Sequence, residues 1–254
     1  MRSPLDIAGA GAGLVLGAVA AVRRGKPVHP HGAAYSARLV VPGAASAPPS
    51  AALLSRPGRH AAIVRFSRSL GVPRPLPDLL GLSIRIPNAY GDGAHQDFLL
   101  VTSIDRPVLD RIFVPARDAQ QRPYSSSLPY RAGGERFLIG ALPRASSPRP
   151  PGDTELDRVR AAAATGRLAF DLAVARPRGR FRAVAELRIG EPLPQAVDAL
   201  RFNPFNCGGG VEPAGALNAM RRTAYPISQA AWRRAQPGGG RAQDAAERVL
   251  AAPQ

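Results

Sequence analysis

The chain has 254 residues, enough for one sizeable domain with its own core, and a formal net charge of +16. Lys26 is its single lysine, and the arginines that supply the charge are spread through every segment. This distribution favours a solvated basic surface over a nucleic-acid site, so we expect no nucleic-acid partner. The single cysteine, Cys207, excludes an intramolecular disulfide and a cysteine-based zinc site, and it fits a cytoplasmic location.

Near its N-terminus the chain contains an uncharged stretch rich in Ala and Gly, at residues 7–22. It is shorter than the roughly 20 apolar residues that span a bilayer comfortably, and the stronger charge follows it instead of preceding it as in a signal peptide. We therefore predict an N-terminal helix over residues 1–25, packed on a single domain over residues 26–254. Contact of residues 7–22 with a membrane is the less favoured alternative.

Short β-favouring runs bounded by Gly and Pro recur through the domain and predict about eight strands. The runs cover residues 34–41, 61–67, 80–86, 96–103, 111–116, 136–142, 167–175 and 181–189. In the seventh run, Leu168, Phe170 and Leu172 alternate with smaller or polar residues, which is the period of a half-buried strand. The last two runs flank a short Arg- and Gly-containing turn, which predicts a hairpin. Sequential antiparallel strands of this number predict a barrel or sandwich.

Helical segments are fewer. A first helix is predicted over residues 153–166, because this stretch begins with an N-cap candidate, Asp153 or Thr154, and ends in glycine. A second helix is predicted over about 213–225, because its first residue is a proline that suits the first turn, and a third over 241–251. The predicted fold class is α+β: an antiparallel β-barrel with helices packed on its outside.

The C-terminal part holds Arg221 and Tyr225, four residues apart, followed directly by Pro226. Residues at this spacing share one face of a helix, so the guanidinium would lie beside the phenol and favour the phenolate. A phenolate is a hard anionic ligand for ferric iron, and tyrosine is one of the axial ligands of haem proteins. Pro226 predicts a kink or an end of the helix. Taken alone, such a pair is far more often an ordinary surface contact.

The sequence around this pair resembles the proximal segment of the haem catalases. That segment runs through G-I-E-P to R-x-x-x-Y, and here residues 210–213 read GVEP ahead of Arg221 and Tyr225. Ser228 stands where the family usually has threonine. The resemblance implies that Tyr225 ligates the iron, that Arg221 is its partner, and that haem b is the cofactor.

Further segments are similar to catalases in the same order along the chain. The family pattern H-x-x-G before the first barrel strand fits the four residues from His29, which implies that His29 is the distal histidine. Lys26 takes the place of an arginine that contacts a haem propionate. Residues 62–86 look like the R-F-S segment of the family. By this resemblance Arg65 would contact a propionate, and Ser67 would hydrogen-bond the histidine.

Residues 95–103 resemble the strand that carries the catalytic asparagine in catalases, but no asparagine stands there. The position falls near Val101 or Thr102, and the hydroxyl of Thr102 or Ser103 is the substitute. We take Thr102 as the catalytic candidate beside His29. The chain is also much shorter than a typical catalase subunit. Both features favour a peroxidase using organic hydroperoxides or small reductants over efficient dismutation of hydrogen peroxide.

The resemblance thus implies a haem-dependent peroxidase or minor catalase acting on hydrogen peroxide or organic hydroperoxides. His29 would move a proton between the peroxide oxygens, and Arg65 and Lys26 would neutralise the propionates. We expect a peroxide and a small-molecule reductant as partners, and a homo-oligomer. Two alternatives stay open: an enzyme that transforms lipid hydroperoxides, in the manner of catalase-like allene oxide synthases, and a non-catalytic haem-binding or degenerate member.

Overall fold

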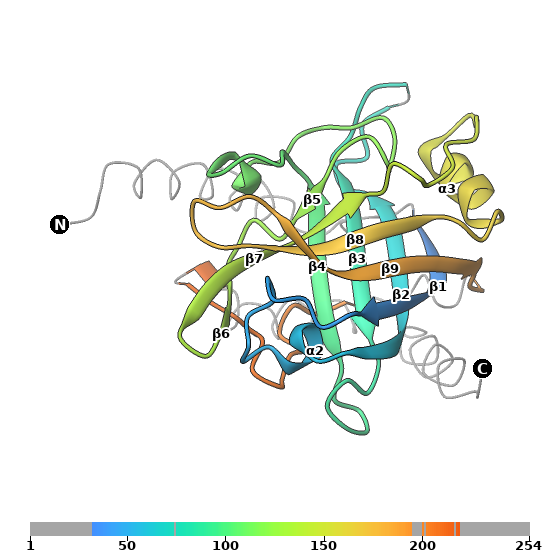
Figure 1. The fold of residues 1–254 in the computed structure, drawn as a ribbon. Helices are drawn as coiled ribbons and strands as arrows, with labels where there is room; N and C mark the ends of the chain where they lie inside the picture. Colours follow the sequence, from blue (N-terminus) through green and yellow to red (C-terminus); the bar gives the residue numbers. More distant parts are fainter. Residues whose placement is uncertain (1–31, 74, 195–199, 201, 216, 219–254) are drawn as a thin grey trace, which may run out of the picture.

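The computed structural model describes residues 32–73, 75–194, 200, 202–215, 217 and 218. In this part of the chain, eight antiparallel strands close into a barrel (Figure 1). They are β1 (Gly32–Val41), β2 (Gly58–Arg68), β3 (Leu80–Ile86), β4 (Gln96–Thr102), β5 (Tyr124–Ser125), β7 (Glu135–Pro143), β8 (Ala169–Ala175) and β9 (Arg182–Pro192). Their order around the barrel is β7-β5-β4-β3-β2-β1-β9-β8, and β8 pairs with β7 to close it. The predicted antiparallel barrel is confirmed.

The barrel interior is filled by side chains, because residues alternate between the two faces of each strand. Rings from different strands pack edge to face or tilted there, with Phe66 placed 6.0 Å from Tyr35 and 5.8 Å from Phe170 between ring centroids. A cavity at one end has a volume of only about 10 Å³, roughly what one water molecule requires. At this end the interior therefore has no room for a ligand larger than a water molecule.

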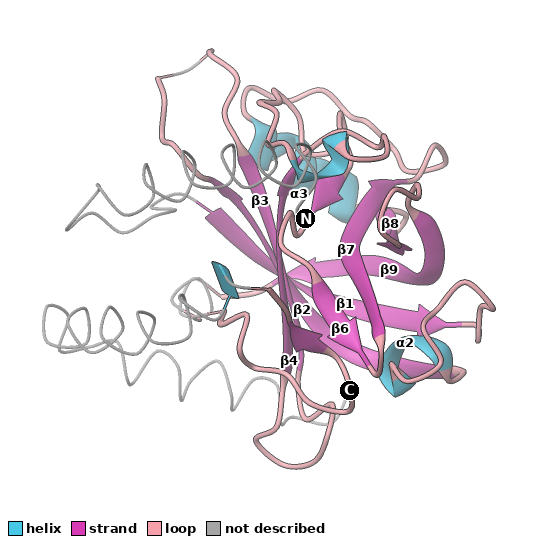
Figure 2. Ribbon diagram, turned by 90° about the vertical axis from the view of Figure 1, so that its left-hand side faces the viewer, coloured by secondary structure: helices cyan, strands magenta, loops and turns pink. Residues whose placement is uncertain are grey.

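Three short helical elements accompany the described strands: α2 (Ala52–Ser55), η1 (Leu109–Arg111, a 3₁₀ turn) and α3 (Glu155–Ala163). In both Figure 1 and Figure 2, α3 lies toward the top of the barrel and α2 toward the bottom. Thr154 caps α3, since its Oγ1 accepts a hydrogen bond from the backbone N–H of Asp157 at 3.1 Å. This confirms the helix predicted over 153–166. None of the described helices is long and apolar enough to cross a membrane.

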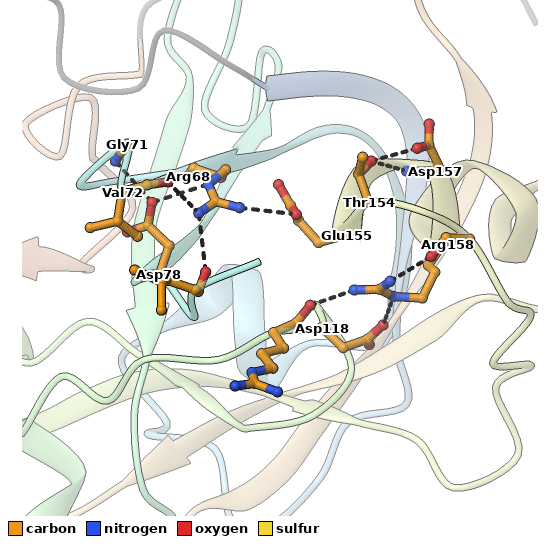
Figure 3. A network of polar contacts seen from close by, with 12 residues as sticks. Arg68, Gly71, Val72, Asp78, Asp118, Thr154, Glu155, Asp157 and Arg158 are labelled. Carbon is orange, nitrogen blue, oxygen red and sulfur yellow. Dashed lines mark hydrogen bonds and ion pairs between the residues drawn. The ribbon is translucent and has the colours of Figure 1, made fainter. Parts of the chain in front are cut away.

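A buried ionic network joins α3 to the loop between β2 and β3 (Figure 3). Arg68 donates through Nε to Asp78 and through Nη1 to Glu155, both at 3.2 Å. The carboxylate of Asp78 also accepts the backbone N–H groups of Leu70 and Gly71 at 2.9 and 2.8 Å. One buried guanidinium thus bridges two carboxylates, and the hydrogen bonds of Asp78 to the backbone fix the path of this loop.

One predicted element is wrong, and the predicted start of another is corrected. The predicted strand at 111–116 is η1 followed by irregular chain, with a single bridge between Ala116 and Asp78. Pro115 has no N–H to give to a ladder, and the eighth barrel strand is instead β5. The helix predicted over about 213–225 does not begin at Pro213, because Pro213 belongs to the short strand β10 (Glu212–Pro213), which pairs with β6 (Tyr130–Ala132). Residues 217 and 218 are helical, and the predicted range beyond residue 218 lies outside the described residues. The helices predicted over 1–25 and 241–251 lie outside the described residues.

Candidate functional site

The outer face of β2 carries two of the predicted site residues, Arg65 and Ser67. They alternate with Val64 and Phe66, whose side chains belong to the core inside the barrel. Arg65 is half-buried and Ser67 is buried. The structure therefore brings the predicted propionate-binding arginine and the predicted partner of the distal histidine onto one face.

Strand register arranges the outer-face residues of β1 to β5 in rows across the sheet. One row consists of Gly32, Ser67, Gly81, Val101 and Ser125. The next row consists of Ala34, Arg65, Ser83 and Leu99. A single cation and three hydroxyls thus stand among small and aliphatic residues. Such a surface can contact a flat apolar ligand that bears a carboxylate.

The guanidinium of Arg65 lies directly against Gly32. A Cβ on Gly32 would stand 2.6 Å from Cζ and Nη2 of Arg65, and 2.7 Å from the carbonyl oxygen of Phe66. Only glycine permits this approach. Gly32 is also the last residue of the pattern that starts at His29. The described end of this pattern, Gly32, therefore lies beside Arg65 and Ser67.

Thr102 is separated from this face. It alternates with Val101 on β4, is fully buried, and its Oγ1 accepts a hydrogen bond from the backbone N–H of Leu80 at 3.2 Å. The Ser103 hydroxyl donates to backbone carbonyl groups of the following loop at 2.8 and 3.0 Å. The residue that lies in the row with Ser67 is Val101. An aliphatic side chain thus replaces the hydroxyl that we expected from Thr102.

A buried ion pair on the same outer face, Arg85 with Asp97, was not anticipated. The Nε and Nη2 groups of Arg85 each donate to the Asp97 carboxylate at 2.7 Å, and the side chains are 2% and 0% exposed. Asp97 Oδ2 also accepts the backbone N–H of Asn203 at 2.8 Å and the Nδ2 group of Asn206 at 3.0 Å. One carboxylate therefore holds the chain that returns to the barrel after β9.

The GVEP segment continues this attachment. The strand β10 pairs with β6, and the backbone N–H of Ala214 donates to the carbonyl oxygen of Pro129 at 2.8 Å. The buried Asn218 donates through Nδ2 to the carbonyl oxygens of Ala214 and Pro129 at 2.9 and 3.3 Å. The chain is thus fixed to the barrel up to three residues before Arg221. The predicted site residues outside the described part are Lys26, His29, Arg221 and Tyr225.

Two of the described tyrosines are held as neutral phenols. The Tyr90 hydroxyl donates to Gln96 Oε1 at 2.8 Å, and the Tyr124 hydroxyl donates to the carbonyl oxygen of Ala119 at 2.9 Å. Burial raises the pKa of both phenols above the usual value. Neither is suited to act as a phenolate. Among the described residues, no group of three His, Cys, Asp or Glu side chains could hold a metal ion.

Comparison with known proteins identifies the architecture. No protein-family model and no curated protein matches the sequence. Among solved structures, a bacterial catalase is similar with a TM-score of 0.53 and 12% identity, over 79% of this chain and 56% of the catalase chain. A fungal catalase is similar with a TM-score of 0.56 and 11% identity, over 79% of this chain and 58% of the catalase chain. The chain has a catalase-like fold and spans little more than half the length of these catalases.

Proposed function

We propose that this protein is a haem-dependent oxidoreductase, a peroxidase or minor catalase that acts on hydrogen peroxide or organic hydroperoxides. The observation that carries the proposal is the outer face of β1 to β4 on a catalase-like barrel. There the guanidinium of Arg65 lies over Gly32 and the buried Ser67 stands in the adjacent row.

The described residues of this face fit a haem group. The packed interior excludes a macrocycle, whereas the outer rows combine glycines with Leu99 and Val101, which suit the apolar face of a porphyrin. Arg65 would bind a propionate, because a guanidinium pairs well with a carboxylate. Lys26 would neutralise the other propionate. When bound, the haem would supply the redox chemistry on the peroxide bond.

The remaining roles belong to residues ahead of β1 and after Asn218. His29 would take a proton from one peroxide oxygen and deliver it to the other, and Ser67 would hydrogen-bond its ring and fix the tautomer. Tyr225, as a phenolate, would ligate the iron. Arg221, one helical turn earlier, would keep the phenolate ionised.

The composition of the outer face supports organic hydroperoxides as substrates. Beside Ser67 the row continues with Gly81 and Val101, whose side chains donate no hydrogen bond. An aliphatic wall favours an organic group over the second hydroxyl of hydrogen peroxide, which needs a polar partner. We therefore expect turnover of an organic hydroperoxide with a small-molecule reductant to exceed oxygen release from hydrogen peroxide.

The absorption spectrum of the full chain reconstituted with haem b tests the proposal. We expect a high-spin ferric Soret band that weakens or shifts in Tyr225→Phe. The matched control is Tyr90→Phe, which removes one hydroxyl from a neutral phenol bound to Gln96 and leaves the band unchanged. Failure of the wild-type chain to take up haem, or an identical band in Tyr225→Phe, would contradict the proposal.

Activity of the haem-loaded chain separates the alternatives. We expect oxidation of a reductant by cumene hydroperoxide, lost in His29→Ala and retained in His60→Ala, a half-buried histidine on β2. Conversion of a fatty-acid hydroperoxide without any reductant would favour the lipid-transforming enzyme. A haem-loaded protein inert to every peroxide would favour the non-catalytic alternative.

A further inference from the structure

We propose that the turn at residues 106–112 and the neighbouring β8–β9 hairpin form a docking surface for anionic lipid membranes. The inference is independent of haem binding. The turn exposes three large apolar side chains: Val108 is 54% exposed, and Leu109 and Ile112 are each 40% exposed. Several apolar side chains that share one short turn form a patch, unlike single exposed residues scattered over a surface.

The backbone holds this turn in a strained conformation that presents its apolar residues. Val108 has a φ of +72°, which is unfavourable for a β-branched residue and persists only where the surroundings enforce it. The backbone N–H of Asp110 donates to the carbonyl oxygen of Arg106 at 2.9 Å. Ser103 Oγ donates to the carbonyl oxygen of Asp110 at 3.0 Å. The exposed apolar tip is thus a fixed feature of the fold.

The β8–β9 hairpin places additional positive charge beside the turn. The backbone N–H of Phe181 contacts Asp105 Oδ1 at 3.4 Å, and the Phe181 ring covers Gly140 of β7. In Figure 1 the hairpin and the green 3₁₀ turn are neighbours at the left of the barrel. Exposed arginines of the two segments include Arg106, Arg111, Arg176, Arg178, Arg180 and Arg182.

Acidic groups near this surface offset only part of that charge. Asp110 is buried, and Asp105 is half-buried and accepts the hairpin N–H. Glu135 forms an ion pair with Arg176 at 3.0 Å. The surface therefore combines an apolar tip with exposed arginines, which outnumber the acidic groups and belong to the turn itself and to the adjoining hairpin.

An anionic bilayer is the partner that satisfies both parts of this surface. Apolar side chains can enter the boundary of the acyl chains while arginines contact lipid phosphates. The formal net charge of +16 adds long-range attraction to such a membrane. A nucleic acid would use the arginines but not the aliphatic tip. A second copy of the chain would bring the arginines of two identical surfaces together, which is repulsive.

Vesicle co-sedimentation with the full chain tests the proposal. We expect binding to phosphatidylcholine vesicles that contain phosphatidylglycerol, and little binding to phosphatidylcholine alone. Combined Val108→Ser, Leu109→Ser and Ile112→Ser should weaken binding about tenfold or more, because the inserted surface is lost. The matched control is Leu70→Ser with Leu76→Ser, which changes exposed apolar residues of a different loop.

The arginine contribution is tested in the same assay. Combined Arg178→Ser and Arg180→Ser should weaken binding several-fold and reduce its salt dependence. The control is combined Arg38→Ser and Arg59→Ser on β1 and β2, which removes the same charge elsewhere and should weaken binding less. All changed side chains are exposed, so thermal melts should show retained folding. Absence of wild-type binding, or wild-type binding by the apolar variant, would overturn the proposal. Wild-type binding by the apolar variant would mean that the chain attaches by another route, through residues 7–22 or through charge alone.

Discussion

The two faces of β1 to β4 differ sharply although the same strands form them. The inner face is mostly apolar, and Phe66 and Phe98 pack there at 2% and 0% exposure. The outer face is divided. At one end the Arg85–Asp97 pair lies beneath the returning chain, and at the other Arg65 and Ser67 stand among glycines and aliphatic residues. The inner face contributes most to stability, and the outer face contains the candidate chemistry together with one structural ion pair.

Removal of a large inner side chain should have the largest effect on stability. We expect Phe66→Ala to lower the free energy of unfolding by about 3–5 kcal/mol, since it leaves a cavity among packed rings. Ser67→Ala, one residue further on the opposite face, should cost less than about 1.5 kcal/mol. Urea unfolding of both variants checks this. Equal losses would contradict the division of roles between the faces.

Breaking the buried ion pair should rank second. Asp97→Asn removes the negative charge opposite Arg85 and weakens the attachment of Asn203, so we expect a loss of about 2–4 kcal/mol. The control is Asp171→Asn, whose partner Arg144 is one-third exposed, and its cost should stay below about 1 kcal/mol. Chemical denaturation measures both. If Asp97→Asn lowers the free energy of unfolding no more than the control does, the Arg85–Asp97 pair is not a structural element.

A Cβ added at Gly32, the first residue of β1, should have an intermediate effect on stability. We expect Gly32→Ala to cost about 1–3 kcal/mol, because its Cβ meets a guanidinium that can move and a Phe66 carbonyl that cannot. Gly134→Ala is the control, since a Cβ there meets nothing within 4 Å. Thermal unfolding compares them. If Gly32→Ala unfolds at the same temperature as wild type, the position of Arg65 does not depend on this glycine.

The smallest effect should depend on pH. Burial raises the pKa of Asp110 to about 6 from 3.8, with Arg111 opposing the shift and Asp105 adding to it. Folding therefore favours the protonated carboxyl, so this stabilisation is fully present below about pH 4 and is lost as the pH rises through about 6. Asp110→Asn should gain about 1–2 kcal/mol at about pH 7.5 and flatten the profile. The control is Asp92→Asn, which changes an exposed carboxyl. If the dependence of stability on pH is unchanged in Asp110→Asn, as we expect for the control, this account is contradicted.

Alternation and turn residues were sufficient to predict most of the barrel. Seven of the predicted strand runs correspond to β1, β2, β3, β4, β7, β8 and β9. The eighth strand was missed because β5 has only two residues, too few to show a period. The apolar run at 111–116 contains Pro115, and apart from a single bridge at Ala116 it is not part of the sheet. Local pattern identifies long strands but not which short segment closes a barrel.

The site residues show a similar limit. That Arg65 and Ser67 lie on one face could be predicted, because they stand two residues apart on one strand; their roles stay predictions. Thr102 and Val101 could not be distinguished without knowing which face each occupies, since a shift of one residue exchanges the faces. The Arg85–Asp97 pair had a signal, because two successive apolar strands each carry one buried charge of opposite sign. Antiparallel pairing then brings the two charges together.

Haem titration of Arg65→Ala tests the central claim, that the outer face of β1 to β4 is the functional face. Arg59→Ala is the control, because Arg59 is an exposed arginine in an outward position of the same strand, six residues earlier. We predict that wild type and Arg59→Ala bind haem equally, and that Arg65→Ala binds about tenfold more weakly while remaining folded by circular dichroism. Equal haem affinity of Arg65→Ala and wild type would contradict the account.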